Sequence, residues 1–196
     1  MSKNTALIML DYINDIVHPD GKYAKEGYYN QIISRSIIEN ASKALKKARE
    51  LDYLIIHVIV GFSKSYSECP SHSTVFELAK KENSLQFNTW STDIYHKVAP
   101  LDNEIIISKN RVSPFFQTNL ELILRNNKIE NLIIAGISTE FVVLATCMEA
   151  HDRDYQTTVI EDATASSTLE LHTSAINVIR RTSNVKLTNE IFSIEE

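Results

Sequence analysis

The stretch LIIAGISTEFVVLATCMEAHDRDYQTTVIEDATAS, residues 132–166, contains the pattern that decides the fold. It begins with the apolar run Leu132–Ala135 and ends with a second short run, Thr157–Ile160. Between them, a helix is expected from about Thr139 to Asp152. The first run is apolar throughout, as is typical of a strand that is covered on both faces. A strand, a helix and a further strand in this order predict a βαβ unit with parallel strands.

The same alternation continues outward from this stretch. Further strands are expected at Ala6–Leu10, Tyr53–Val60, Glu104–Ser108 and, more weakly, Val185–Leu187. One helix is expected between the first two strands, with an apolar face made of Ile33, Ile37, Ala41, Ala44, Ala48 and Leu51. A second helix is expected to begin at Thr118 and Glu121, which have the spacing of a capping box, and to run through Arg125. A third is expected from about Thr168 to Ile179. The sequence therefore predicts a single domain, residues 1–196, with a three-layer α/β/α architecture and a six-stranded, mostly parallel sheet.

Composition excludes several classes of protein. The chain has 196 residues, of which 43% are hydrophobic and 23% charged, as in an ordinary globular domain. Its net charge of -5 argues against a protein that binds nucleic acid non-specifically. The four glycines cannot build a G-x-G-x-x-G or Walker-type loop, so the two commonest phosphate-binding loops are excluded. The expected partner is a small-molecule substrate, with neither nucleic acid nor membrane.

The two cysteines, Cys69 and Cys147, do not make a disulfide framework. The opening segment MSKNTALIML lacks the length of a signal sequence, and no run reaches the ~18 apolar residues of a membrane span. We therefore expect a reducing, cytoplasmic location.

Chemistry is expected where the strands end, because ligands of open α/β sheets bind beyond the carboxyl ends of the strands. Asp11 follows the first strand and Lys109 the third, while Gly136–Val142 follows the fourth and leads into a helix. The start of that helix offers free backbone N–H groups, which suit a carboxylate or an oxyanion. Spacing alone slightly favours another interpretation, in which Asp11 is a turn or cap residue and Lys109 a surface charge.

Three segments together resemble the isochorismatase-like hydrolase family over nearly the whole chain. They are LIMLDYINDI (7–16), KNRVSPFF (109–116) and the stretch quoted above. The resemblance implies the strand order 3-2-1-4-5-6 and a homo-oligomer, either a dimer or a tetramer. It also implies a non-proline cis peptide at Ile137–Ser138.

The resemblance further implies that Asp11 is the catalytic acid/base and Lys109 its charged neighbour. Members of the family carry a G-x-x-T motif, which here is Gly136–Thr139. In members that use a cysteine, the nucleophile lies three residues beyond this threonine. This position is Val142, which has no nucleophilic atom. Thioester chemistry is therefore not expected, whereas the route of true isochorismatases, in which an aspartate protonates a vinyl ether, needs no thiol. Backbone N–H groups near Ser138 and Val142 would contact developing negative charge.

Four residues are candidates for substrate binding: Phe62, Trp90, Arg111 and Thr139. Arg111 suits a carboxylate because a guanidinium binds it in a bidentate manner; Lys64 is a weaker candidate. The aromatic side chains of the irregular segment 61–100 predict either a pocket wall or a loop that covers its own small core.

No cofactor and no metal are expected. The pairs Cys69/His72 and Cys147/His151 superficially suggest zinc but are far apart in the chain. The segment VIVGFSKSY (58–66) has neither the Asp nor the His with which the nicotinamidase branch of the family holds a metal. Cys147 is expected to be a small buried apolar residue.

The sequence therefore predicts a hydrolase that acts on a small, carboxylate-bearing metabolite through Asp11 without a cysteine nucleophile. The alternative is a catalytically silent family member that binds a small metabolite or serves as an oligomeric partner. In either case, the charged ends of Asp11 and Lys109 are expected within hydrogen-bonding distance, at a pocket rim wet enough that breaking the pair costs little stability.

Overall fold

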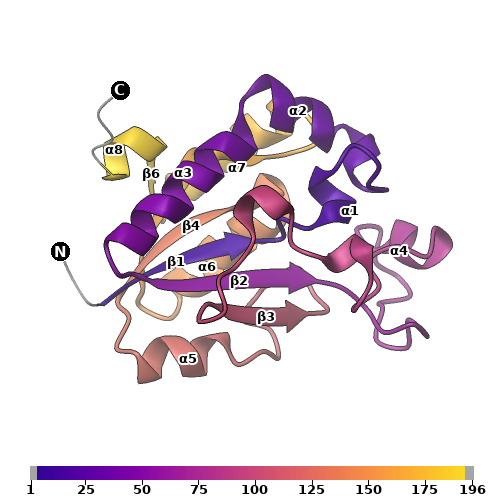
Figure 1. The fold of residues 1–196 in the computed structure, drawn as a ribbon, viewed down its shortest axis with the longest axis horizontal. Helices are drawn as coiled ribbons and strands as arrows, with labels where there is room; N and C mark the ends of the chain where they lie inside the picture. The colour runs from indigo at the N-terminus through magenta and orange to yellow at the C-terminus, as the bar shows by residue number, and fades with distance from the viewer. Residues whose placement is uncertain (1–3, 193–196) are drawn as a thin grey trace.

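The computed structural model describes residues 4–192. Six strands form one sheet in the order β3-β2-β1-β4-β5-β6, which confirms the order implied by the family resemblance (Figure 1). Every neighbouring pair is parallel. The strands are β1 Thr5–Leu10, β2 Leu54–Val60, β3 Ile105–Lys109, β4 Asn131–Ile137, β5 Gln156–Ala165 and β6 Asn184–Lys186.

Helices cover both faces of the sheet, because the central strand is apolar on both sides. Leu7 and Met9 of β1 pack into one core with helix α3 (Ile37–Glu50). Ala6, Ile8 and Leu10 pack into the other core, which also takes in residues of α5 (Leu120–Asn126), α6 (Leu144–His151) and α7 (Leu169–Ile179). Alternate side chains of one strand thus reach opposite layers.

The remaining elements are short. They are the α-helices α1 (Asn14–Val17), α2 (Tyr28–Ser34), α4 (Glu77–Lys81) and α8 (Thr188–Phe192), the 3-10 helices η1 (Ala24–Glu26), η2 (Trp90–Thr92) and η3 (His96–Val98), and the π-helix η4 (Thr139–Val143). Figure 1 shows the carboxyl ends of β1, β2 and β3 pointing toward the side on which α1 and α4 lie. No helix within residues 4–192 is long and apolar enough to cross a membrane.

The single helix expected between β1 and β2 is wrong: the segment forms α2 and α3. Ser36 separates them with a left-handed φ of 52°, which breaks the helical repeat. Ile33 is 59% exposed, so it does not belong to the buried face. From Ile37 to Ala48 the predicted face is correct, because Ile37, Ala41, Ala44 and Ala48 are all buried. Its last residue, Leu51, is wrong: it follows α3 and is 48% exposed.

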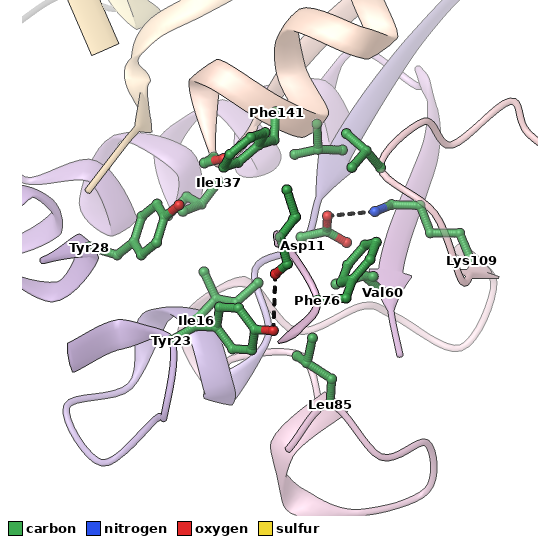
Figure 2. Close-up of a pocket in the computed structure, with 14 residues that line it drawn as sticks. Asp11, Ile16, Tyr23, Tyr28, Val60, Phe76, Leu85, Lys109, Ile137 and Phe141 are labelled. Atoms are coloured by element: carbon green, nitrogen blue, oxygen red, sulfur yellow. Dashed lines mark hydrogen bonds and ion pairs between the residues drawn. The ribbon is translucent and has the colours of Figure 1, made fainter. Parts of the chain in front are cut away.

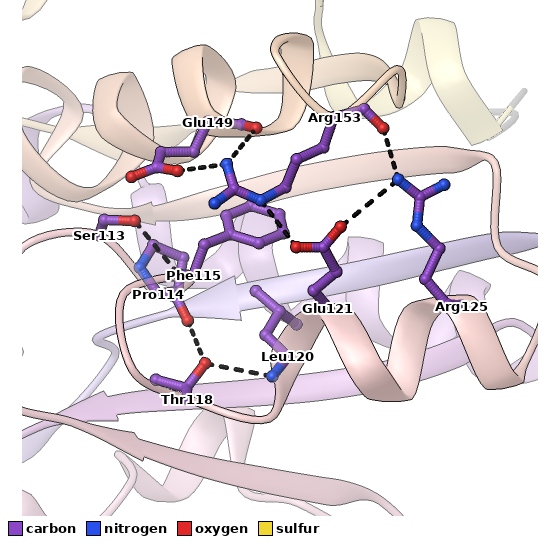
Figure 3. Close-up of polar contacts among 9 residues, drawn as sticks. All are labelled: Ser113, Pro114, Phe115, Thr118, Leu120, Glu121, Arg125, Glu149 and Arg153. Atoms are coloured by element: carbon purple, nitrogen blue, oxygen red, sulfur yellow. Dashed lines mark hydrogen bonds and ion pairs between the residues drawn. The ribbon is translucent and has the colours of Figure 1, made fainter.

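The capping box expected at Thr118 and Glu121 does not form. Asn119 is the N-cap of α5, and the Thr118 hydroxyl oxygen instead accepts a hydrogen bond from the backbone N–H of Leu120 at 3.1 Å. Glu121 turns toward Arg125 and Arg153 (Figure 3). Ion pairs within α5 and with the turn after α6 therefore replace the reciprocal cap.

The expected helix from Thr139 to Asp152 is present in two parts, η4 and then α6. The expected helix from Thr168 is confirmed as α7, where the Thr168 side chain caps the first turn by accepting from Leu171 N at 3.2 Å.

Candidate active site

The centre of the site is an ion pair between the ends of β1 and β3. Lys109 Nζ donates to Asp11 Oδ2 at 2.8 Å, although 98 positions separate the two residues (Figure 2). This confirms the proximity expected from the sequence. Asp11 lies directly after β1 in a left-handed conformation, with φ at 57°. Its backbone N–H donates to Val58 O of β2 at 2.8 Å, which fixes the turn.

The expectation that this pair is wet is wrong. The side chains of Lys109 and Asp11 are only 1% and 4% exposed. Asp11 follows the central strand β1, whereas Lys109 ends the edge strand β3, and both side chains are buried. Separating the pair therefore carries the cost of a buried charge rather than that of a surface ion pair.

Burial moves the two pKa values toward each other. It raises the pKa of Asp11 above its ordinary value of 3.8, and the ammonium of Lys109 opposes this rise. Burial also lowers the pKa of Lys109, and the carboxylate of Asp11 opposes that change. Asp11 thus holds a proton more readily than an exposed aspartate does, as suits a group that must both take and return one.

One oxygen of Asp11 has no partner. Oδ1 is buried and makes no hydrogen bond to any residue that the structure describes, whereas Oδ2 accepts from Lys109. Lys109 Nζ also donates to Arg111 O at 3.1 Å. Buried carboxylate oxygens are rarely left without a partner, so Oδ1 is the atom to which a ligand or a water molecule would bind.

Asp11 and Lys109 face a small cavity of about 80 Å³ (Figure 2). Its walls are mostly apolar and come from four regions of the chain. The lining residues are Asp11, Ile16, Tyr23, Tyr28, Val60, Val75, Phe76, Leu85, Lys109, Val112, Ile137, Ser138, Phe141 and Val142.

The turn after β4 brings Val142, which the family resemblance assigns to the nucleophile position, to this cavity. The Ile137–Ser138 peptide is cis, as the family resemblance implies. Ser138 and Val142 both line the cavity, with Val142 only 2% exposed. The structure therefore places an isopropyl group, rather than a thiol, beside Asp11.

Two of the expected substrate-binding residues, Phe62 and Trp90, do not line the cavity. Phe62 is completely buried and packs edge-to-face against Phe76, with ring centroids 5.2 Å apart. Trp90 is 46% exposed and contacts His18 at 5.1 Å between ring centroids. Of the two alternatives for the segment 61–100, the structure favours the pocket wall, because Val75, Phe76 and Leu85 line the cavity. Phe62 and Phe76 pack into the large core shared with β1 and α3, not into a small core of their own.

The other two, Arg111 and Thr139, are also absent from the cavity wall. Arg111 Nη1 donates to the carbonyl oxygens of Glu68 and Asn110 at 2.9 and 2.7 Å. The Thr139 hydroxyl is completely buried and bonds to His172 Nδ1 at 2.8 Å. Neither side chain is placed to bind a carboxylate in this cavity. Lys64 is exposed and does not line it either.

Sequence reasoning missed two tyrosines of the wall. Tyr23 donates its hydroxyl proton to Val75 O at 3.2 Å, and Tyr28 donates to Glu140 Oε1 at 3.1 Å. Both follow the first strand in a polar segment without periodicity. Their place after a strand that ends in a candidate catalytic residue was the one signal for them.

Neither cysteine shows a reactive environment. Cys147 is completely buried in α6, and burial raises the pKa of its thiol to about 12. Burial also raises the pKa of Cys69. Among residues 4–192, no group of three or more His, Cys, Asp or Glu side chains is placed to hold a metal ion.

Comparisons with known proteins give a consistent result. The model of the isochorismatase domain matches residues 5–193. Ureidoacrylate amidohydrolase RutB of Agrobacterium fabrum is 28% identical over 172 residues, which are 82% of this chain and 75% of that protein.

Solved structures share the fold. A cysteine hydrolase from Pseudomonas syringae has a TM-score of 0.86 at 19% identity, covering 97% of this chain and 92% of its own. N-carbamoylsarcosine amidase from Thermoplasma acidophilum has a TM-score of 0.75 at 22% identity, covering 98% and 99% of the two chains.

Proposed function

The chain belongs to the isochorismatase family of hydrolases, and we propose that it hydrolyses a small molecule by acid/base chemistry at Asp11, without a cysteine nucleophile. Lys109 is the charged partner that holds Asp11 in place. The observation that carries this proposal is the buried 2.8 Å ion pair at a mostly apolar cavity, with Asp11 Oδ1 left free.

The proposed reaction needs one proton carrier. Asp11 Oδ1 takes a proton from a water molecule as its oxygen bonds to the substrate, and gives a proton to the leaving atom as the scissile bond breaks. The two proton transfers can also occur in the reverse order. Asp11 then first protonates the substrate and afterwards takes a proton back from the attacking water molecule. In both, the net reaction consumes one water molecule and Asp11 ends as it began.

Val142 also favours a second candidate, a family member that binds a metabolite without turning it over. Its isopropyl group occupies the position of the nucleophile, and it is buried against the cavity. In this alternative, Asp11 and Lys109 would bind a ligand rather than transform it.

A substrate screen distinguishes the two candidates. Purified wild-type protein is expected to hydrolyse members of a panel of small amides, esters and vinyl ethers, and Asp11→Asn is expected to lose that turnover. Product formation is measured by mass spectrometry, with Asp102→Asn as a control that removes an exposed carboxylate. Ligand binding by both proteins with turnover by neither would support the silent binder instead.

Thiol reagents provide an independent prediction. Iodoacetamide is expected to leave turnover largely intact, because Cys147 is buried and its thiol has a pKa of about 12. Val142→Cys is expected to add one rapidly alkylated thiol, since it places sulfur at the cavity beside Lys109. Peptide mass spectrometry locates the adducts. An acyl group trapped on Cys147 during turnover would contradict a mechanism that does not involve cysteine.

A further inference from the structure

We infer that the cavity takes a small, uncharged molecule with a compact apolar body and an N–H or O–H group that donates to Asp11 Oδ1, and that it rejects carboxylates. The inference rests on the proposed function in one respect: it concerns the same cavity. It runs opposite to the carboxylate-bearing substrate that the sequence predicts.

The walls define the body of the ligand. Ile16, Val60, Val75, Leu85, Val112 and Phe141 present hydrocarbon groups from separate segments of the chain. A ligand gains affinity in such a site by removing apolar surface from water. The space of about 80 Å³ beside Asp11 suits a compact apolar group.

The charges define what the ligand cannot carry. Among the described residues that line the cavity, Lys109 is the one cation, and its charge is already matched by Asp11. Arg111 is held by two backbone carbonyl groups away from the wall. A carboxylate would therefore enter without a free counter-charge and would face Asp11. Like charges placed side by side in such a site repel each other and weaken binding.

The hydrogen-bond inventory defines what the ligand must carry. Asp11 Oδ1 is a buried acceptor without a partner. Tyr23 and Tyr28 each give their single hydroxyl proton to Val75 O and Glu140 Oε1, so toward the cavity their oxygens can only accept. Asp11 Oδ1 is therefore the acceptor that a ligand has to satisfy. A ligand with an uncharged N–H or O–H group satisfies it, whereas a carboxylate does not.

Four probes that share one apolar body separate charge from donor capacity. Isobutyramide and isobutanol are uncharged donors, N,N-dimethylisobutyramide is uncharged without a donor, and isobutyrate is charged without a donor. Each is titrated at neutral pH into wild-type protein, and binding is followed by the methyl NMR signals of Val60, Val112 and Val142. Isobutyramide and isobutanol are expected to bind at least about tenfold more tightly than the other two, as one unmatched charge or one unsatisfied buried acceptor predicts.

Asp11→Asn tests the electrostatic argument directly. The variant removes the negative charge and leaves the Lys109 ammonium without a counter-ion, so isobutyrate is expected to become the tightest of the four probes. Asp102→Asn removes an exposed carboxylate outside the cavity and is expected to keep the wild-type order.

Tighter binding of isobutyrate than of isobutyramide to wild-type protein would overturn the inference, as would the absence of valine shifts with all four probes. If Asp11→Asn does not fold, the order of the four probes on the wild-type protein still decides. Binding needs no turnover, so the result is separable from the substrate screen. A protein that hydrolyses nothing but prefers the uncharged donors keeps this inference and loses the proposed function.

Discussion

Replacing Lys109 with methionine is expected to reduce turnover by about 100-fold or more, as much as replacing Asp11 with asparagine, because this is the scale of one lost acid–base element. The two side chains share a 2.8 Å ion pair and are both buried. Removing the ammonium leaves the Asp11 carboxylate in the same apolar surroundings without its partner. The pKa of Asp11 then rises further, so a smaller fraction of the carboxyl is ionised and able to act as a base.

The double variant is expected to be little worse than either single variant, since the pair acts as one unit. Turnover is measured for wild type, the two single variants and the double variant. Lys64→Met is the matched control, because it removes an exposed ammonium that does not line the cavity. Multiplicative losses in the double variant would show instead that Lys109 acts separately, as a binding residue.

Lys109→Met is also expected to change the pH dependence in a defined direction. Burial raises the pKa of Asp11 above 3.8 and the Lys109 ammonium opposes that rise, so the pKa is higher still in the variant. If Asp11 acts as a base, the acid limb of the activity profile moves to higher pH.

The stability of Lys109→Met is also expected to depend on pH, in a direction set by the same pKa shift of Asp11. A carboxyl group whose pKa is higher in the folded than in the unfolded chain stabilises the fold below the unfolded pKa, and this contribution disappears as pH rises through the folded pKa. The loss in stability relative to wild type is therefore smallest in acid and grows toward neutral pH, where breaking a buried pair costs about 3–5 kcal/mol. Thermal unfolding at several pH values measures it. A loss that does not depend on pH would contradict the burial of an unpaired Asp11.

The positions of the strands and the Asp11–Lys109 pair could be predicted because each follows from a pattern in a short stretch of sequence. A strand that is covered on both faces must be apolar almost throughout, as Leu132–Ala135 is. A polar residue directly after such a strand lies at the binding edge of a parallel sheet, which describes Asp11. The order of the strands in the sheet does not follow from any short stretch of sequence, and it was predicted from the family resemblance.

The cavity wall could not be predicted residue by residue, because long-range contacts shape the segment that supplies it. The backbone N–H of Leu85 donates to Asp15 Oδ2 at 2.8 Å, across 70 positions. Phe62 N donates to Leu85 O at 2.7 Å. These bonds turn Leu85 toward the cavity and Phe62 into the core, and neither direction follows from periodicity. Arg111 shows the same limit: its residue type suits a carboxylate, but backbone carbonyl groups already bind it.

The second large effect is expected from one methyl group at the start of the catalytic turn. Gly136 of β4 pairs with Leu10 of β1, directly before Asp11. A Cβ atom at position 136 would lie 2.5 Å from Leu10 Cβ and 2.7 Å from Leu10 O. Both distances are shorter than van der Waals contact allows. Both Leu10 atoms belong to the central strand β1, which is hydrogen-bonded to a neighbouring strand on each side.

Gly136→Ala is therefore expected to lower the free energy of unfolding by about 3 kcal/mol, the upper range of overpacking. For a chain of this size, this corresponds to a drop of roughly 6–12 °C in the melting temperature. Turnover by the remaining folded protein should fall as well, since a shift of Leu10 displaces Asp11 from Lys109. Gly61→Ala is the control: its Cβ would lie 2.7 Å from the Phe87 ring, a side chain that can move aside, and 3.0 Å from Leu85 O, so a smaller loss is expected. An equal loss in both variants would mean that the added methyl acts on the unfolded chain or on general packing, whereas a larger loss in Gly136→Ala shows that the close approach of β1 and β4 holds the Asp11 carboxylate in place.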